Sequence, residues 1–302
     1  MANRKPTDLT KLIGNTPLIQ LDSFCTKKYN IYAKLEGENI GGSIKDRVAL
    51  ALITDLEKRK LLKKNKTIIE PSSGNTGIGL AMIAAKKGYA VRIVLPENAT
   101  PERIAILKMF GTKVEFCKKE EWVGETAIKK IKELAKSDTS LVMPNQYENQ
   151  ICAQVHFETT GKEITKQIPN ITHLVATVGT GGTISGIGKR MKSFNNQIQV
   201  VGVEVGSNSS IPGPRSLEGY IPPILDFTVI DQGFKIRNEL EVHKIHKQLC
   251  TQEGLFYGIS SAAALHGALE IAKKIEFSGN KKAHIVCVFP DRGEKYLSQF
   301  IK

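Results

Sequence analysis

The sequence predicts an α/β protein made of two three-layer αβα domains with mostly parallel, twisted sheets. Strand-like and helix-like segments alternate regularly between residues 67 and 136, and the alternation begins again after residue 149. Such alternation is typical of parallel sheets joined by right-handed crossovers. The length of 302 residues also suits about two domains of ordinary size.

The first half of the chain supplies the elements of one such unit. Residues 12–19 are expected to form a turn that enters a strand, and residues 30–36 another strand. Ser43 is expected to cap a helix running to residue 53, so that Lys45 lies in its first turn, just beyond a strand end. Ligands collect at such places in open α/β sheets. Further strands at 67–70, 91–95 and 113–117 alternate with helices at 78–87, 102–110 and 125–136.

The second half repeats the pattern. We expect a long helix through Thr160 and Ile164, a strand at 173–177 and a helix that continues to residue 192. Residues 207–226 are rich in Ser, Pro and Gly and are expected to form a loop over a cleft. A helix at 240–253, a helix beginning near Ser260 and a strand at 284–289 complete the chain.

A glycine-rich loop is the strongest local signal for an anion site. Four glycines occur in eight residues from Gly179 to Gly186, at a strand-to-helix junction. Glycine lets the backbone approach phosphate oxygens closely. The loop does not read Gly-x-Gly-x-x-Gly, and Glu204 is the nearest acidic residue that could hold a ribose. A dinucleotide site therefore stays a minor alternative.

Composition excludes several classes of protein. No run of eighteen apolar residues occurs, so no membrane span is expected, and the N-terminus lacks the apolar stretch of a signal peptide. We therefore expect a cytoplasmic protein. The net charge of +13 comes from scattered Lys and Arg without interleaved aromatics, which favours small anions over nucleic acid as partners.

The cysteines and histidines do not form a convincing metal or disulfide pattern. The five cysteines are widely spaced and form no Cys-x-x-Cys pair. His243, His246 and Cys250 could share a helix face with Glu239. Packing is the better explanation for them than metal binding, because such helical spacings arise often by chance. No metal is expected.

Five motifs together resemble the cysteine synthases, which are pyridoxal-phosphate enzymes of the tryptophan-synthase-β fold type (fold type II). They appear in the family's order and spacing across nearly the whole chain. The motifs are Ile13-Gly14-Asn15-Thr16-Pro17-Leu18, Gly42-Ser43-Ile44-Lys45-Asp46-Arg47, Ser73-Gly74-Asn75-Thr76-Gly77, Gly179-Thr180-Gly181-Gly182-Thr183 and Gly258-Ile259-Ser260-Ser261. The segments from Ser210 to Arg215 and from Asp291 to Ser298 are similar to those of the B-type synthases.

The resemblance implies a role for each motif. Lys45 matches the lysine that forms the imine with the cofactor and then carries the Cα proton. Asn75 matches the amide that bonds the cofactor's 3′-hydroxyl, and Ser260 the hydroxyl that faces the pyridine nitrogen. The phosphate cup is implied at Gly179, Thr180, Gly181, Gly182 and Thr183. Groups on the substrate side are implied at Ser72, Ser73, Gly74, Thr76 and Gln146, with Arg215 and Tyr220 from the 207–226 loop.

The resemblance also implies the reaction and the architecture. It implies a smaller, mobile domain at 36–148, a larger domain made of 1–35 and 149–302, and a homodimer. The implied activity is β-replacement through an aminoacrylate, in which O-acetyl-L-serine and a sulfur nucleophile, sulfide or another donor, give L-cysteine. The alternatives are an enzyme that consumes cysteine, releasing hydrogen sulfide and forming serine or lanthionine, and a binding protein without chemistry.

This sequence departs from the family pattern on the substrate side. Ser72 stands where threonine is usual, Ala99 where methionine is common and Ala262 where glycine usually follows the serine pair. Arg215 stands alone where B-type enzymes often have two arginines. These departures leave the leaving group and the nucleophile open, but not the cofactor.

Overall fold

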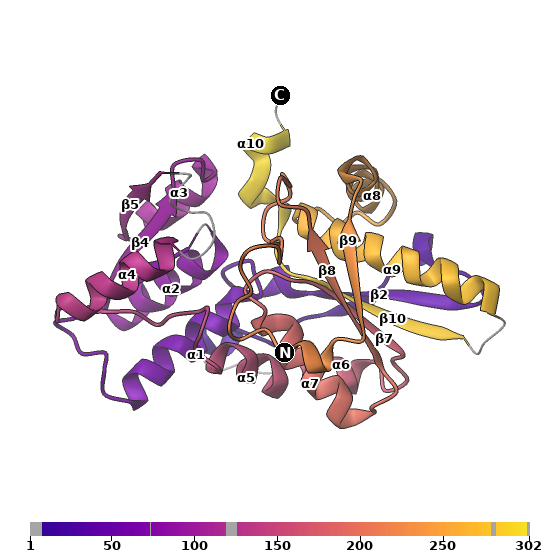
Figure 1. The fold of residues 1–302 in the computed structure, drawn as a ribbon, viewed down its shortest axis with the longest axis horizontal. Helices are drawn as coiled ribbons and strands as arrows, with labels where there is room; N and C mark the ends of the chain where they lie inside the picture. The colour runs from indigo at the N-terminus through magenta and orange to yellow at the C-terminus, as the bar shows by residue number, and fades with distance from the viewer. Residues whose placement is uncertain (1–7, 73, 119–125, 279–281, 301–302) are drawn as a thin grey trace, which may run out of the picture.

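The computed structural model describes residues 8–72, 74–118, 126–278 and 282–300. Within these ranges the chain forms two mostly parallel sheets that lie side by side, each with helices on both faces (Figure 1). The predicted α/β class with two parallel sheets is therefore confirmed.

The larger sheet has six strands. In spatial order they are β1 (Leu18–Gln20), β2 (Tyr29–Leu35), β10 (Ala283–Phe289), β7 (His173–Thr177), β8 (Gln199–Val205) and β9 (Gln232–Ile236). Only β1 runs antiparallel to its neighbour among these strands. Strand β10, near the C-terminus, pairs along its whole length with β2, near the N-terminus, so the two ends of the chain close the same sheet.

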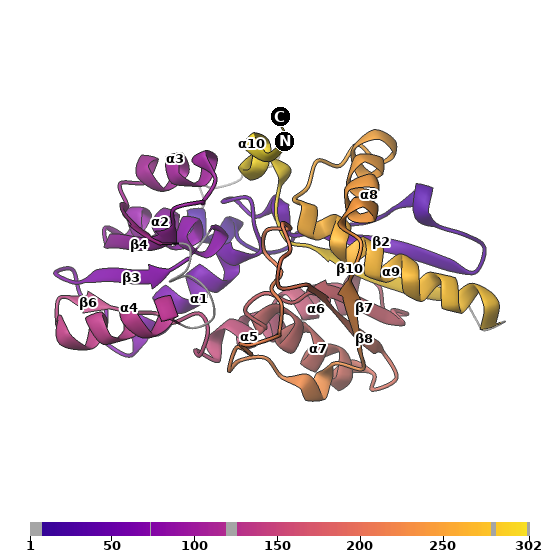
Figure 2. The same ribbon diagram turned by 45° about the horizontal axis from the view of Figure 1, so that its top comes forward.

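Helices cover both faces of this sheet (Figure 2). One face carries α8 (Glu239–Gln252) and α9 (Ile259–Ser278). The other carries α5 (Ile151–Glu158), α6 (Thr160–Gln167) and α7 (Gly182–Phe194). A sheet that is covered on both faces requires strands that are apolar throughout. In β10, Cys287 and Phe289 face the α9 side, whereas Val286 and Val288 face the α7 side.

The smaller sheet has four parallel strands. In spatial order they are β5 (Lys113–Cys117), β4 (Ala90–Pro96), β3 (Thr67–Pro71) and β6 (Leu141–Val142). Helix α2 (Asn75–Lys87), backed by α1 (Lys45–Lys58), packs on one face with α3 (Pro101–Met109) beside it, and α4 (Thr126–Ser137) packs on the other. Neighbouring residues of β3 again divide between the faces, since Ile68 packs toward α2 and Ile69 toward α4.

Short helical segments connect these elements. They are η1 (Leu9–Leu12), η2 (Asp22–Phe24), η3 (Glu36–Glu38), η5 (Phe227–Val229), η6 (Gly293–Tyr296) and α10 (Leu297–Phe300). None of the helices in the described ranges is long and apolar enough to cross a membrane.

Two predicted helix starts and one predicted helix differ from the structure. Helix α1 begins at Lys45 with Ile44 at its N-cap, although the Ser43 hydroxyl still accepts the Lys45 N–H at 3.2 Å. Helix α2 begins three residues before the predicted residue 78, at Asn75. The predicted long helix through residues 160 and 164 is instead two helices, broken at Thr159, where φ and ψ are −117° and −80°. The Thr159 hydroxyl bonds the Val155 carbonyl at 2.5 Å, and such bonds back to the preceding turn bend helices.

The parallel strands bring the predicted motifs to one edge. The loops that follow β2, β7 and β10 all leave the carboxyl end of the larger sheet, because these three strands run in the same direction. The loop that follows β3 leaves the corresponding end of the smaller sheet. The predicted domain boundaries at residues 36 and 148 stay a prediction, as does the mobility of the smaller domain.

Candidate active site

The loop between β7 and α7 can exist only with glycine at two positions. Gly181 has φ +92°, and a Cβ there would lie 2.7 Å from the Leu225 Cβ. A Cβ on Gly179 would lie 2.8 Å from the Gly213 carbonyl oxygen. These distances are shorter than real Cβ contacts, so side chains are excluded and the backbone stays open toward the adjoining cavity.

This cavity gathers most of the predicted cofactor residues. Its lining includes Lys45, Asn75, Gly179, Thr180, Gly181, Thr183 and Ser260. Gly182 is the exception, because it begins α7 behind the loop, where a Cβ would lie 3.1 Å from Ile224 Cδ1. A glycine-lined anion cup at the start of a helix, a lysine and a serine hydroxyl fit pyridoxal phosphate, which has a phosphate, an aldehyde and a ring nitrogen.

Lys45 lies in the wall between two cavities. Its half-buried side chain borders both the glycine-lined cavity and a second, more polar one. Burial lowers the pKa of the Lys45 amine, while the neighbouring Cys152 and Asp291 oppose this shift. A lowered pKa raises the fraction of neutral amine, which is the form that attacks an aldehyde and accepts a proton.

The second cavity gathers the predicted substrate residues. Its lining includes Ser72, Gly74, Thr76, Gln146 and Arg215 together with Lys45. The Thr76 hydroxyl donates to Gln146 Oε1 at 2.6 Å, and Gln146 Nε2 donates to the Pro71 carbonyl at 3.0 Å. Ser73, the remaining residue of that loop in the prediction, lies outside the described residues.

Arg215 gives this cavity a positive charge held between two tyrosines. Its guanidinium carbon lies 5.3 Å from the centre of the Tyr147 ring and 5.2 Å from that of Tyr220. Both distances are within the range of cation–π attraction. Tyr220 thus contacts Arg215 and is not part of the described cavity lining, whereas Tyr147 is.

Several residues that line the two cavities were not predicted from the sequence as site residues. Arg103 and Tyr147 line the second cavity, Asp291 lines the first, and Gly213 and Tyr296 line both. Asp291 could have been found, because it follows β10 at the same sheet edge as the glycine loop. Arg103 has no comparable signal in the sequence, since α3 positions it beside Gly74 and 4.5 Å from the Tyr296 ring centre.

A buried histidine supports Thr183, in the first turn of α7. His156 Nε2 lies 3.3 Å from the Thr183 hydroxyl, and Nδ1 lies 3.0 Å from the Thr160 hydroxyl. Burial lowers the pKa of His156 well below its usual range. The imidazole is therefore neutral, so that one ring nitrogen donates and the other accepts.

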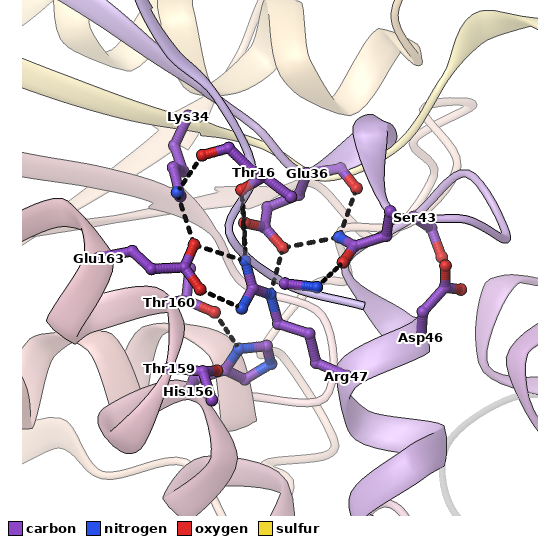
Figure 3. Close-up of polar contacts among 12 residues, drawn as sticks. Thr16, Lys34, Glu36, Ser43, Asp46, Arg47, His156, Thr159, Thr160 and Glu163 are labelled. Atoms are coloured by element: carbon purple, nitrogen blue, oxygen red, sulfur yellow. Dashed lines mark hydrogen bonds and ion pairs between the residues drawn. The ribbon is translucent and has the colours of Figure 1, made fainter. Parts of the chain in front are cut away.

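A buried ion network fixes the first turn of α1 (Figure 3). Arg47 binds two carboxylates, each through a pair of hydrogen bonds of 2.6–2.8 Å: Glu36 after β2 and Glu163 on α6. Lys34 of β2 also bonds Glu163, at 2.7 Å. Although burial opposes it, Arg47 and Lys34 hold the pKa of Glu163 at about 2. Arg47 thus holds Lys45, two residues earlier, against the larger sheet.

Of the histidine and cysteine candidates on α8, His246 is buried and packs in the core, Cys250 is half-buried and His243 is exposed. His246 Nε2 donates to the Tyr257 carbonyl at 2.6 Å, and its ring stacks on Phe300 at a centroid distance of 5.2 Å. Glu239 instead accepts hydrogen bonds from Ser210. The described residues contain no group of three potential ligands close enough to hold a metal ion.

Comparisons with known proteins show the family of this chain. The sequence model of the family described as pyridoxal-phosphate dependent enzymes matches residues 9–291. The chain is 38% identical to a cysteine synthase of Staphylococcus aureus (strain N315), over 99% of this chain and 97% of that protein. It is 37% identical to cysteine synthase B of Escherichia coli (strain K12), over 96% and 94%. The crystal structure of a hydrogen sulfide-producing enzyme from Fusobacterium nucleatum is similar, with a TM-score of 0.88, 34% identity and coverage of 97% and 100%.

Proposed function

Because the chain belongs to the pyridoxal-phosphate dependent enzymes and is cysteine synthase-like, we propose that it makes L-cysteine from O-acetyl-L-serine and a sulfur nucleophile. The observation that carries the proposal is the position of Lys45 between a glycine-lined anion cavity and a polar cavity with a guanidinium. One lysine can then face the cofactor on one side and the substrate on the other.

The residues of the two cavities have different roles in a β-replacement. When bound, pyridoxal phosphate withdraws electrons from the substrate's Cα, which allows loss of the β-substituent. Lys45 supplies the amine that removes the Cα proton. Thr76 and Gln146 orient the substrate carboxylate, because their hydrogen bond to each other and the bond of Gln146 to Pro71 fix both side chains. Ser260, which lines the cofactor cavity, would offer the ring nitrogen a neutral hydroxyl, which would not hold it protonated as a carboxylate would.

The role of Lys45 is tested by reduction and by substitution. Borohydride treatment of the cofactor-loaded protein, followed by peptide mapping, should place the reduced cofactor on Lys45. Lys45→Ala should lower turnover of O-acetylserine by at least about 10²–10⁴-fold, the usual contribution of a general base. Lys136→Ala, on the exposed face of α4, is the matched control and should keep full activity. Modification of another lysine would show that Lys45 is misassigned.

A second candidate reaction is the consumption of L-cysteine with release of hydrogen sulfide. The similarity to the hydrogen sulfide-producing enzyme favours it. Steady-state assays with O-acetylserine plus sulfide, and with cysteine alone, separate the two. Turnover of O-acetylserine should exceed sulfide release from cysteine, and negligible turnover of O-acetylserine would replace the first proposal by the second. Assembly as a homodimer stays a prediction, which light scattering would test.

A further inference from the structure

The side-chain amide of Asn75 is held by two neighbours with opposite hydrogen-bonding character. Asn75 Nδ2 donates to Asp291 Oδ2 at 2.6 Å, and Asn75 Oδ1 accepts from Lys295 Nζ at 3.1 Å. An ammonium group has only donors and a carboxylate only acceptors. Exchanging the amide oxygen and nitrogen would therefore break both bonds and place donor against donor and acceptor against acceptor. The chemistry of the neighbours fixes the orientation of the amide.

Both neighbours are themselves held in place. Lys295 is only 6% exposed and also donates to the Gly41 carbonyl at 2.9 Å. Asp291 is 1% exposed, and Asp291 Oδ2 also accepts the Tyr296 hydroxyl. Asp291, Lys295 and Tyr296 all belong to the segment that follows β10. Because that segment is buried against the start of α2, the amide cannot reorient without a rearrangement of the segment.

The fixed amide presents a donor to the cofactor cavity. An amide nitrogen has two N–H groups, and Asp291 takes one of those of Asn75. Asn75 borders both cavities, as Lys45 does. The ring oxygen of pyridoxal phosphate is attached next to the carbon that carries the aldehyde, so a group beside Lys45 is placed to meet this oxygen. We propose that Lys295 and Asp291 are positioning residues that turn the remaining Asn75 N–H, and not its carbonyl oxygen, toward the ring oxygen and so favour its ionised form.

The physical basis is the response of an acid to its hydrogen-bond partner. A donor stabilises an oxyanion, whereas an acceptor stabilises the neutral hydroxyl. The ionised ring oxygen gives the bound cofactor its visible absorption band, and the neutral form absorbs in the near ultraviolet. The proposal rests on the cofactor and on Lys45 as its lysine, but not on the identity of the substrate.

The test compares two substitutions that remove opposite charges from the two neighbours of the Asn75 amide. Lys295→Met removes a positive charge and Asp291→Asn removes a negative one. If the two residues acted on the ring oxygen through their charge alone, the variants would shift the ionisation in opposite directions. If they act by orienting Asn75, both variants weaken the preference of the amide for the orientation that points its N–H toward the ring oxygen. Both then shift absorption from the visible to the near ultraviolet. Spectra of the loaded variants without substrate give this readout.

Cofactor affinity gives a second readout. Loss of one hydrogen bond to the cofactor should weaken pyridoxal phosphate binding by roughly tenfold in both variants. Lys295→Arg keeps the donors and should restore the wild-type spectrum and affinity. Thr100→Val is the matched control, because it removes only the hydroxyl that bonds the Lys295 carbonyl at 3.1 Å and leaves the ammonium in place. It should retain the wild-type spectrum.

A double substitution shows whether the effect passes through Asn75. In an Asn75→Ala protein, adding Lys295→Met should cause no further spectral shift. A further shift of the same size as in the wild type, opposite shifts for Lys295→Met and Asp291→Asn, or unchanged spectra in both single variants would each overturn the proposal. None of these outcomes bears on the proposed function, which would fail if Lys45 did not bind the cofactor or if the protein did not turn over O-acetylserine.

Discussion

We predict that Glu70 makes the free energy of unfolding of this protein fall as pH rises through neutrality. Its carboxylate, at the end of β3, is completely buried and accepts the backbone N–H groups of Asn145 and Gln146 at 2.9 and 3.0 Å. Burial outweighs these two bonds and raises the pKa of Glu70 from 4.5 to about 8. Between these values the folded protein holds a proton that the unfolded chain has lost, so the free energy of unfolding decreases as pH rises.

The size of the effect follows from the shift. Each pKa unit corresponds to about 1.4 kcal/mol, so the whole shift is worth at most about 5 kcal/mol. Glu70→Gln removes the titration. At pH 5 we expect the variant to be less stable than the wild type by about 1–3 kcal/mol, because the new carboxamide NH₂ faces a backbone N–H. The difference should shrink with rising pH and reverse by pH 9, where the wild type has a buried charge.

Urea unfolding followed by circular dichroism at five pH values between 5 and 9 measures both curves. The exposed Glu133 of α4 supplies the matched control, since Glu133→Gln should keep the pH dependence of the wild type. Parallel curves for the wild type and Glu70→Gln would refute the reasoning, because they would show that Glu70 does not titrate in this range.

Two further substitutions test features of the core and of the glycine loop. Arg47→Met should lower the free energy of unfolding, measured in urea, by about 3–5 kcal/mol, since it leaves the Glu163 carboxylate without its bidentate partner. The control is Arg59→Met, which removes a pair whose arginine is 58% exposed. It should lower the free energy of unfolding by less than about 1 kcal/mol. Equal losses would contradict the importance of the buried network. Gly181→Ala should destabilise by about 1–3 kcal/mol or more and weaken cofactor binding, because φ is +92° and the Leu225 side chain fills the space. Gly206→Ala, where a Cβ meets nothing within 4 Å, should be neutral, and a loss there equal to that of Gly181→Ala would show that steric exclusion is not the cause.

The sequence was most informative about strands that are buried on both faces. The predicted strand at 173–177 coincides with β7, because a short apolar run bounded by polar residues fits few other structures. The predicted strand at 113–117 also coincides with β5, although β5 is a partly exposed edge strand that contains Lys113 and Glu115. The helix break at Thr159 was not predictable from periodicity. It depends on a hydroxyl that bonds the preceding turn, and many threonines within helices do not interrupt them.

The candidate site was predictable where one loop suffices and less so where distant segments meet. The glycine loop could be predicted from its composition alone. The contact between Thr76 and Gln146 joins positions 70 residues apart, and only the resemblance to a family indicated it. Arg103 was not identified as a cavity residue, because its place depends on how α3 packs against the segment after β10.

Helix α1 belongs to both halves of the molecule. Its first turn is tied to the larger sheet through Arg47, whereas its later turns pack on α2 beside the smaller sheet. Lys45 therefore shares a rigid helix with residues that pack beside the smaller sheet, while Arg47 ties its own turn to the larger sheet. A substitution in the later turns of α1 can thus alter the position of the cofactor lysine without contacting either cavity.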